Sequence, residues 1–188
     1  MNIKKEQLNL NDLILNVLED IIVINNTKEE KLKGVDNSSS NNNRRKILYN
    51  ASEKEEVIIE ANRIRLIQVI SNLIDNAIKF TKEEDTISIM VEKKKVNSNI
   101  NNNDIKTKEE KQEKEIVIVS VKDTGTGIDS EILPRLFSKF ASKSYKGTGL
   151  GLFISKSIIE DHGGRIWAEN NADGKGATFS FSLPIIIQ

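Results

Sequence analysis

The placement of glycine constrains this chain more than any other feature of its sequence. Nine of its ten glycines follow residue 124, and five of these nine fall in two short clusters, residues 123–127 and 147–151. Glycine has no Cβ, so it permits positive φ angles and lets a ligand approach the backbone closely. The second cluster leads directly into a segment with helical spacing of apolar residues. A glycine-rich turn that opens a helix offers free N–H groups and the positive end of the helix dipole, which favours an anion such as phosphate.

Size and composition exclude several classes of protein. The 188 residues suit one domain that carries insertions. Lys and Arg number 28, as do Asp and Glu, so net charge gives no general attraction to nucleic acid or to an anionic membrane. The absence of cysteine excludes disulfides and thiol chemistry. No apolar run approaches the roughly 20 residues of a membrane-spanning helix, and the residues after Met1 are too polar for a signal peptide. We therefore expect an intracellular protein that does not bind nucleic acid.

Apolar periodicity predicts four helices. The first helix is expected to begin within residues 8–13, and the other three are expected to cover residues 63–79, 131–137 and 150–161. We expect N-caps at Asn11 or Asp12 for the first helix, Asn62 for the second and Ser130 for the third. The fourth helix is expected to stop at the glycine pair 163–164.

Six short segments have the alternating or β-branched pattern of strands. They are residues 46–51, 57–60, 86–92, 116–122, 165–169 and 177–184. Two Asn-rich, low-complexity insertions interrupt this series, at about residues 36–43 and 93–115, the second as the extended end of a hairpin. Because strands follow one another and helices are few, we expect an α+β fold in two layers, with helices on one face of a mainly antiparallel sheet. A doubly wound fold would need regular β-α alternation instead.

The helix expected at residues 63–79 carries a polar face that suggests a ligand. Asn72, Asn76 and Lys79 stand at i, i+4 and i+7, so they share one side, opposite the apolar stripe. A solvated face is the ordinary explanation, although such faces usually carry Glu, Lys or Gln because Asn is a mediocre helix former. Asn offers a carbonyl oxygen to a hard cation, and Lys offers positive charge to phosphate. Both interpretations stay open on this segment alone.

A carboxylate and two glycines follow the strand expected at residues 116–122. Asp123 stands at the strand end, where it can accept a hydrogen bond from an exocyclic amine such as that of adenine. Gly125 and Gly127 would let a flat base lie against the backbone. Taken alone, these residues are better explained as an ordinary Asp-Gly turn.

The remaining glycine segments are weak indications when each is taken alone. The G-x-G-x-G of residues 147–151 is not a Walker loop, because no Gly-Lys-Ser/Thr follows it, and its spacing differs from the Rossmann fingerprint. The segment GKGATF, residues 174–179, is explained by a plain hairpin turn.

The order and spacing of these segments together resemble the catalytic and ATP-binding domain of sensor histidine kinases. The resemblance covers roughly residues 8–184 and is carried by NLIDNAIKFT, DTGTGI, LFSKF, GTGLGLFISKSIIEDHGGRIW and GKGATFSFSLP. It implies the Bergerat fold of the GHKL superfamily, shared with gyrase, Hsp90 and MutL type ATPases. In that fold a mixed sheet lies under a layer of helices, and ATP binds between the helices and a mobile lid.

The resemblance implies ATP and Mg²⁺ as cofactors and assigns residues to them. Asn76 looks like the asparagine that binds the Mg²⁺ bridging the ATP phosphates, Asn72 like its partner one turn earlier, and Lys79 like the basic residue facing phosphate. Asp123 matches the aspartate that recognises the adenine amine. The other positions carried over are Gly125, Gly127 and Ile128 beside the base, Phe137 and Phe140 at the base of the lid, Gly147, Thr148, Gly149, Leu150, Gly151 and Leu152 at the far lid hinge, and Thr178 near the adenine.

The lid expected between Phe140 and Gly147 is the short sequence ASKSYK. Its flanking and internal lysines, Lys139, Lys143 and Lys146, are explained equally well as phosphate contacts and as solvated charges. A lid of this length is shorter than is common in the family.

Asn72 and His162 bear on the kind of chemistry that the resemblance implies. Hydrolytic relatives carry a glutamate at the position of Asn72 to activate water, and an amide cannot act as a general base near pH 7, so transfer is favoured over rapid hydrolysis. His162 is the only histidine and matches the helix-ending E-x-H-G-G, which is not the phosphoacceptor. We therefore expect a structural role for His162. The acceptor is expected on an upstream helical hairpin, with residues 1–10 as the link.

The resulting expectation is the kinase core of a two-component sensor. It would position ATP·Mg²⁺ for transfer to a histidine on a separate dimerisation and phosphotransfer domain, with a response regulator receiver domain as an indirect partner. A cytoplasmic location is expected, either alone or as the cytoplasmic part of a membrane-anchored sensor. Two alternatives are a nucleotide-binding switch of the same fold without transferase activity and a serine-directed kinase of the anti-sigma type.

Overall fold

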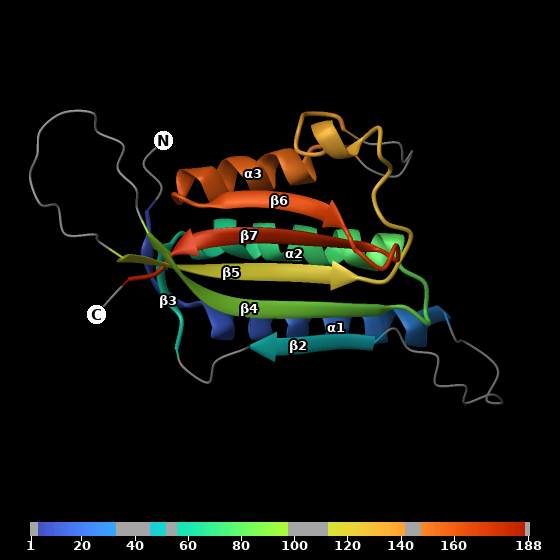
Figure 1. The fold of residues 1–188 in the computed structure, drawn as a ribbon. Helices are drawn as coiled ribbons and strands as arrows, with labels where there is room; N and C mark the ends of the chain where they lie inside the picture. The colour runs from blue at the N-terminus through green and yellow to red at the C-terminus, as the bar shows by residue number, and fades with distance from the viewer. Residues whose placement is uncertain (1–3, 33–45, 52–55, 98–112, 142–147, 187–188) are drawn as a thin grey trace, which may run out of the picture.

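The computed structural model describes residues 4–32, 46–51, 56–97, 113–141 and 148–186 (Figure 1). The insertion expected at residues 36–43 lies outside the described residues, as does the central part of the second one.

A five-stranded sheet forms one layer of the molecule. Its order is β2-β4-β5-β7-β6, in which β2 is parallel to β4 and every other neighbouring pair is antiparallel. The strands are β2 Lys46–Ala51, β4 Thr86–Asn97, β5 Glu113–Asp123, β6 Arg165–Asn170 and β7 Ala177–Pro184. A separate antiparallel pair is formed by β1 Glu6–Asn9 and β3 Ile58–Ala61. The sheet is thus mixed but mainly antiparallel, as expected.

Three helices form the second layer. They are α1 Leu10–Leu32, α2 Arg63–Phe80 and α3 Gly151–Asp161, and a single 3₁₀ turn, η1, covers Leu133–Arg135. Figure 1 shows α1 and α2 behind the sheet and α3 beside β6, and α2 packs between α1 and α3. This arrangement confirms the expected two-layer α+β fold. None of the helices in the described part of the chain is long and apolar enough to span a membrane.

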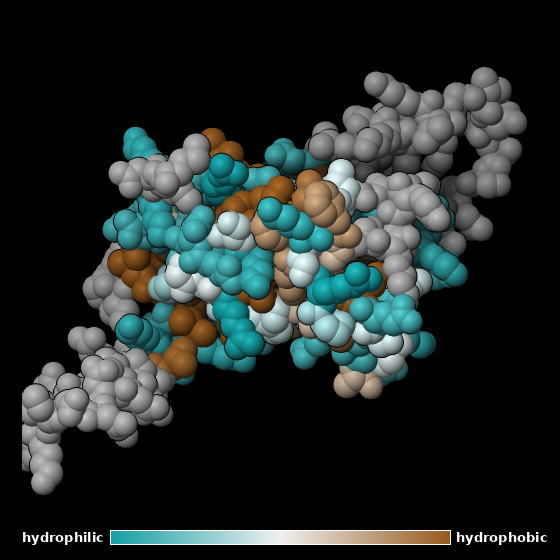
Figure 2. All heavy atoms as spheres, turned by 90° about the horizontal axis from the view of Figure 1, so that it is seen from above, coloured by the Kyte–Doolittle hydropathy of each residue, from teal (hydrophilic) through white to brown (hydrophobic). Residues whose placement is uncertain are grey.

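Period-two patterning of the strands and an apolar stripe on α2 build the core. On β5, Val117, Val119 and Val121 are buried, whereas the alternate residues are only half-buried. The inward side chains of the other strands and the stripe on α2 join the same cluster, to which α1 and α3 also contribute; its members include Ile87, Ile89, Phe179, Phe181, Leu66, Ile70, Leu73 and Ile74. Seen from above, hydrophobic residues reach the surface in separate patches between hydrophilic ones (Figure 2).

The start of α1 differs from the expectation. The helix begins at Leu10, and the side chain of Asn9 accepts a hydrogen bond from the N–H of Asn11 at 3.1 Å. Asn9 is therefore the N-cap, and the proposals of Asn11 and Asp12 were wrong. The reason is that β1 ends at Asn9, so the chain turns into the helix two residues earlier than expected.

The helix expected at residues 131–137 is only the 3₁₀ turn η1. Pro134 has no N–H, so the i→i+4 bond of an α-helix cannot form there, and Arg135, Leu136 and Ser138 donate to carbonyls three residues back. The expected cap, Ser130, was also wrong. The Asp129 carboxylate accepts the N–H of Glu131 at 2.9 Å and thereby begins the turn.

The β4–β5 hairpin is longer than the hydropathy pattern indicated. Residues 93–97 and 113–115 were expected in the insertion but belong to paired strands. Charged residues carry this extension: Lys95 pairs with Glu115, with Nζ and Oε1 4.0 Å apart. A pattern search based on apolar alternation misses such a segment because its pairing is charged and solvent-exposed.

Candidate functional site

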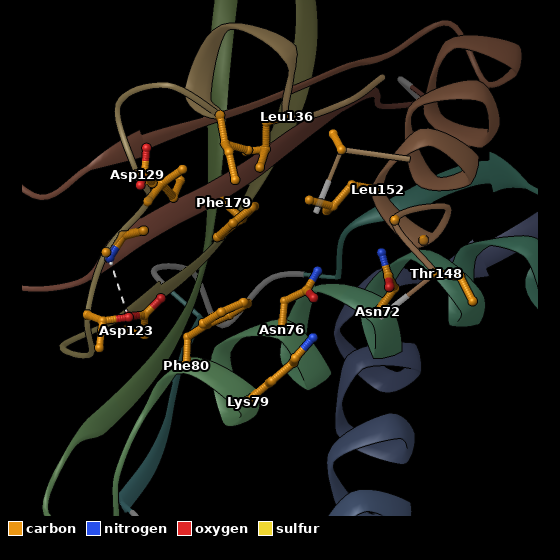
Figure 3. A pocket seen from close by; sticks show the side chains of 18 residues that line it. Asn72, Asn76, Lys79, Phe80, Asp123, Asp129, Leu136, Thr148, Leu152 and Phe179 are labelled. Atoms are coloured by element: carbon orange, nitrogen blue, oxygen red, sulfur yellow. Dashed lines mark hydrogen bonds between the residues drawn. The ribbon is translucent and has the colours of Figure 1, made fainter. Parts of the chain in front are cut away.

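A cavity of about 610 Å³ opens between α2, the loop that follows β5, and the start of α3. Figure 3 shows Asp123 and Asp129 toward one end and Asn72 and Thr148 toward the other, with Asn76 between them. Its walls include a set of apolar side chains: Phe80, Ile128, Ile132, Leu136, Leu152 and Phe179. A cavity with apolar walls and a few convergent polar groups is the usual form of a small-molecule site.

The polar face of α2 lines this cavity as the spacing predicted. Asn72, Asn76 and Lys79 all border it, on the side of the helix away from the buried stripe. Asn62 is the N-cap of α2, and its side chain accepts the N–H of Arg65 at 3.0 Å, so the expected cap is confirmed. The Lys79 Nζ lies 5.3 Å from the centre of the Phe80 ring, which is within cation–π range.

Asn72 is tied to α3 by a hydrogen bond. Its Nδ2 donates to the Oγ of Ser155 at 2.9 Å, and Ser155 is 1% exposed. A Cβ on Gly151 would overlap the Asn72 amide oxygen, so a side chain at that position of α3 would displace the amide. The absence of a side chain at Gly151 thus allows α3 to approach α2 closely at one end of the cavity.

Asp123 ends the central strand β5 and borders the cavity while being only 2% exposed. Its Oδ1 accepts the N–H of Gly125 at 2.9 Å and that of Ala177 at 3.4 Å. Within the described part of the chain, no hydrogen bond involves its Oδ2. Burial raises the pKa of the Asp123 carboxyl, the two backbone N–H groups oppose this, and the Asp85 charge adds to the rise.

The glycines near Asp123 have packing reasons that the sequence did not reveal. Gly125 does not line the cavity, and a Cβ there would overlap the carbonyl oxygen of Phe80. Gly127 does line the cavity, has a φ of +74°, and would place a Cβ 3.0 Å from the Asn170 Oδ1. Gly125 is therefore required by the contact between α2 and the loop.

Two asparagines at the end of β6 hold this part of the site, and the sequence analysis missed both. The Asn170 Oδ1 accepts the Ile128 N–H at 2.6 Å, and its Nδ2 donates to the Ile128 carbonyl at 2.8 Å. The Asn171 Nδ2 donates to the carbonyls of Asp123 and Lys175 at 2.7 and 2.6 Å. An Asn-Asn pair one residue before an Asp-Gly turn is the signal that was available, because Asn side chains commonly bond to backbone in turns.

Thr178 does not border the cavity, although Ala177 and Phe179 on either side of it do. Its hydroxyl instead donates to the Asn171 Oδ1 at 2.7 Å. Because successive side chains of a strand point to opposite faces, only the neighbours of Thr178 face the cavity. The expected contact of Thr178 with a ligand therefore does not follow from this geometry.

The two expected lid hinges differ in how they meet the cavity. Thr148, Gly149, Gly151, Leu152 and Ala141 border it, whereas Leu150, Phe137 and Phe140 do not. Phe137 packs on the core, and Phe140 is 72% exposed. The Phe140 N–H donates to the Gly149 carbonyl at 3.1 Å, which brings the two hinges together. Lys143, Lys146 and Gly147 lie outside the described residues.

His162 is remote from the cavity lining and fully engaged. It is 4% exposed, its Nε2 accepts the Asn62 N–H at 2.9 Å, and its Nδ1 lies 2.7 Å from the Ile158 carbonyl. Because Nε2 accepts, the ring proton is on Nδ1 and is donated to Ile158. His162 therefore connects the end of α3 to the start of α2.

Comparisons with known proteins agree on one family. The family model described as "Histidine kinase-, DNA gyrase B-, and HSP90-like ATPase" matches residues 61–187. Sensor protein FixL of Bradyrhizobium diazoefficiens is 38% identical over 124 residues, which are 66% of this chain and 21% of FixL. Sensor protein SrrB of Staphylococcus aureus is 40% identical over 126 residues, 64% of this chain and 18% of SrrB. The chain thus spans about a fifth of the length of these relatives.

Solved structures support the same assignment over the whole chain. The nucleotide-free catalytic domain of histidine kinase ThkA is 33% identical, with a TM-score of 0.66 over 98% of this chain and 96% of that one. ThkA in complex with the response regulator protein TrrA is 31% identical, with a TM-score of 0.63 over 97% of this chain and 42% of that one. From the matched family model, these relatives and the shared fold, the chain belongs to the histidine kinase-, DNA gyrase B- and HSP90-like ATPases, as a catalytic and ATP-binding domain of the histidine kinase type.

Proposed function

We propose that the cavity binds ATP with Mg²⁺ and that this chain transfers the γ-phosphate to a histidine on a separate domain. The observation that carries the proposal is the separation of two kinds of polar group within one cavity. A buried carboxylate with a spare oxygen, Asp123, lies toward one end, and Asn72 of α2 meets the start of α3 toward the other, with Asn76 between them.

Recognition of adenine is assigned to the end that holds Asp123. Its Oδ1 is engaged by backbone N–H groups, which leaves Oδ2 to accept from the exocyclic amine of the base. The apolar side chains of Ile128 and Phe179 lie nearby in the lining and suit the faces of a flat ring. Asn170 and Asn171 act indirectly, since they bond to the backbone of Ile128 and Asp123 and keep both in place.

The phosphates are assigned to the opposite end. There α3 begins at Gly151 with N–H groups that have no partner within the helix. Lys79, which borders the cavity beside Phe80, is proposed to supply positive charge to the phosphates. The glycines at 149 and 151 let the phosphate oxygens approach the backbone. Lys143 and Lys146 in the lid, and the lid hinge at Gly147, remain proposals from the sequence.

The donor set of the cavity fits Mg²⁺ held jointly by protein and nucleotide. The described residues contain no group of three His, Cys, Asp or Glu side chains that would form an all-protein metal site. Magnesium in nucleotide sites typically takes one or two protein oxygens and completes its shell with phosphate oxygens and water. Asn76 borders the cavity and offers such an oxygen, so it is the residue proposed to hold the ion, which would neutralise phosphate charge.

Transfer is favoured over hydrolysis because the α2 face carries no base. The position one turn before Asn76 is Asn72, and an amide near pH 7 cannot take a proton from water. The chain's contribution is then to position the phosphates and stabilise their charge for in-line attack by an external nucleophile. Since His162 is buried with both ring nitrogens in hydrogen bonds, the acceptor is proposed on a separate dimerisation and phosphotransfer domain.

The test is incubation with radiolabelled ATP and Mg²⁺, with the chain alone and with a histidine-containing acceptor domain of a related kinase added. We expect no stable label on the chain alone and acid-labile label on the added domain. Binding of ATP without transfer to any acceptor would favour the nucleotide switch of the same fold. Label on His162 in the isolated chain would contradict the proposed location of the acceptor.

Two further assignments rest on the relatives. The solved complex of ThkA with the response regulator protein TrrA supports a receiver domain as the downstream partner. The sensor proteins FixL and SrrB support a role in signalling, and the cytoplasmic location expected from the sequence stays a prediction.

A further inference from the structure

Ser155 is a buried polar side chain outside the cavity lining that contacts a residue inside it. It lies in the middle of α3, is 1% exposed, and accepts the Nδ2–H of Asn72 at 2.9 Å. Serine is a poor choice for a helix interior, and an apolar side chain would fill a buried position between two helices at lower cost. The hydroxyl at this position therefore has a use beyond packing.

The hydrogen bond determines how the amide of Asn72 is oriented. An asparagine side chain has a soft terminal torsion, so without a fixed partner its oxygen and nitrogen exchange positions easily. With Nδ2 engaged by Ser155, the amide oxygen lies beside Gly151, where a Cβ would overlap it. Asn72 and Gly151 both border the cavity at the end assigned to the phosphates.

The same bond joins the two helices that form this end. Ser155 stands one turn after Gly151, so it shares a face of α3 with the residue that begins the helix. A shift of α3 along or away from α2 would lengthen the bond and release the Asn72 amide. The orientation of Asn72 is therefore coupled to the position of the helix whose first turn meets the phosphates.

We propose that Ser155 is a positioning residue for phosphoryl transfer, which acts by holding the Asn72 amide in one orientation against α3. The inference rests on the proposed function, because it assigns the purpose of the bond to the phosphate end of the ATP site. Ser155 itself does not line the cavity and is buried, so it acts through Asn72 and not by direct contact with the ligand. Its effect is on the transfer step, since the residues assigned to adenine lie at the other end of the cavity.

The test compares Ser155→Ala with Ser157→Ala, an exposed serine on the same helix. In transfer to a supplied acceptor domain, Ser155→Ala should lower kcat about three- to tenfold while KM for ATP stays within about twofold, as for the loss of one hydrogen bond felt in the transition state. Ser157→Ala should match the parent. Thermal unfolding of each variant identifies any loss of activity that comes from unfolding.

A double-mutant cycle separates positioning from a general structural effect. In an Asn72→Ala background, Ser155→Ala should cause no further loss of kcat, because the side chain through which it acts is gone. An equal loss in both backgrounds would overturn the inference, and so would a parent-like kcat for Ser155→Ala. If the parent chain itself binds no ATP or transfers no phosphate, the proposed function fails. That outcome is measured on the parent alone and is therefore distinct from the results with the variants.

Discussion

The Asp123 carboxyl has opposite effects on the stability of the empty chain and on its affinity for the nucleotide. Its carboxyl is 2% exposed, and burial raises its pKa, with only the N–H groups of Gly125 and Ala177 to compensate. An ionised carboxylate in this setting is unfavourable until a further donor reaches it. The amine of adenine is such a donor, so we expect the residue to cost stability in the empty chain and to contribute affinity in the complex.

Replacing Asp123 by Asn should weaken the binding of an ATP analogue. The change removes the charge from the hydrogen bond to the base, a loss of about 1.5–3 kcal/mol. Titration calorimetry measures the affinity, and Glu83→Gln, which neutralises an exposed carboxyl outside the cavity lining, is the matched control. Unchanged affinity in Asp123→Asn would refute the assignment of adenine to this end.

The same variant gives a pH dependence with a definite sign. Because the folded-state pKa of Asp123 is raised, its contribution to stability is fully present below the ordinary value of 3.8 and is lost as pH rises through the folded-state pKa. In urea unfolding, the free energy of unfolding of the parent should therefore fall relative to that of Asp123→Asn as pH increases over that window. A difference that is constant, or that grows in the opposite direction, would contradict the raised pKa.

Asn76 is the residue on which the metal assignment depends. Asn76→Ala should reduce the gain in nucleotide affinity that Mg²⁺ provides, while metal-free binding changes less, because the lost group is an oxygen ligand on a polar helix face. Calorimetry with and without Mg²⁺ makes the comparison. Gln68→Ala removes an exposed amide from the same helix and should retain the full Mg²⁺ effect. An Asn76→Ala chain that still responds to Mg²⁺ like the parent would show that Asn76 is not a ligand.

At the level of secondary-structure elements, one residue joins three segments of the chain. The Asn62 side chain caps α2 through the Arg65 N–H and donates to the Lys4 carbonyl at 2.9 Å, while its own N–H is received by His162 at the end of α3. The start of one helix, the end of another and the segment before β1 are therefore held at a single point. These bonds give His162, the only histidine of the chain, a structural role, so no chemical role is needed to explain it.

His162→Ala should destabilise the chain by about 2–4 kcal/mol, from lost packing and an unpaired Asn62 N–H. Chemical denaturation measures the loss. Asn62→Ala removes the cap but keeps the backbone N–H, so it should cost only about 1 kcal/mol. If the two variants are equally stable, the bond between His162 and the Asn62 backbone contributes little.

Elements with strong periodicity were predictable from the sequence. The expected strands at 46–51 and 177–184 coincide with β2 and β7, and the bounds of α2 and α3 were within one residue of those observed. In each case the apolar spacing that determines burial also determines the element. The polar face of α2 was predictable for the same reason, since residues opposite a buried stripe must face solvent or a cavity.

Features that depend on distant segments were not predictable. Gly125 is required because the Phe80 carbonyl lies against it, and Asn170 and Asn171 act on residues more than forty positions away. Nothing in the local sequence indicates these partners. The position of Thr178 outside the cavity lining was not predictable for a different reason, because a match to a motif does not say which face of a strand a side chain occupies.

For the molecule as a whole, the sheet order brings the ligand-facing groups together. Asp123 ends β5, Ala177 begins β7, and these neighbouring antiparallel strands place both residues at the same end of the sheet. The helices α2 and α3 lie in the helical layer (Figure 1), and their residues line the cavity together with those at this end of the sheet. The residues that line the cavity, from Asn72 to Phe179, thereby form one site although they are spread over more than half of the chain.

The central position of β5 also has a consequence for hydrogen exchange. Its backbone is bonded to β4 on one side and to β7 on the other, whereas β2 and β6 lie at the edges of the sheet. Amides of β5 should therefore exchange with deuterium only in the largest openings of the fold, and those of β6 and β2 in smaller ones. Native-state exchange followed by mass spectrometry tests this order, and faster exchange in residues 117–121 than in β6 would contradict it. The carboxylate at the end of β5 would then stay in place through the local openings that loosen the edges of the sheet.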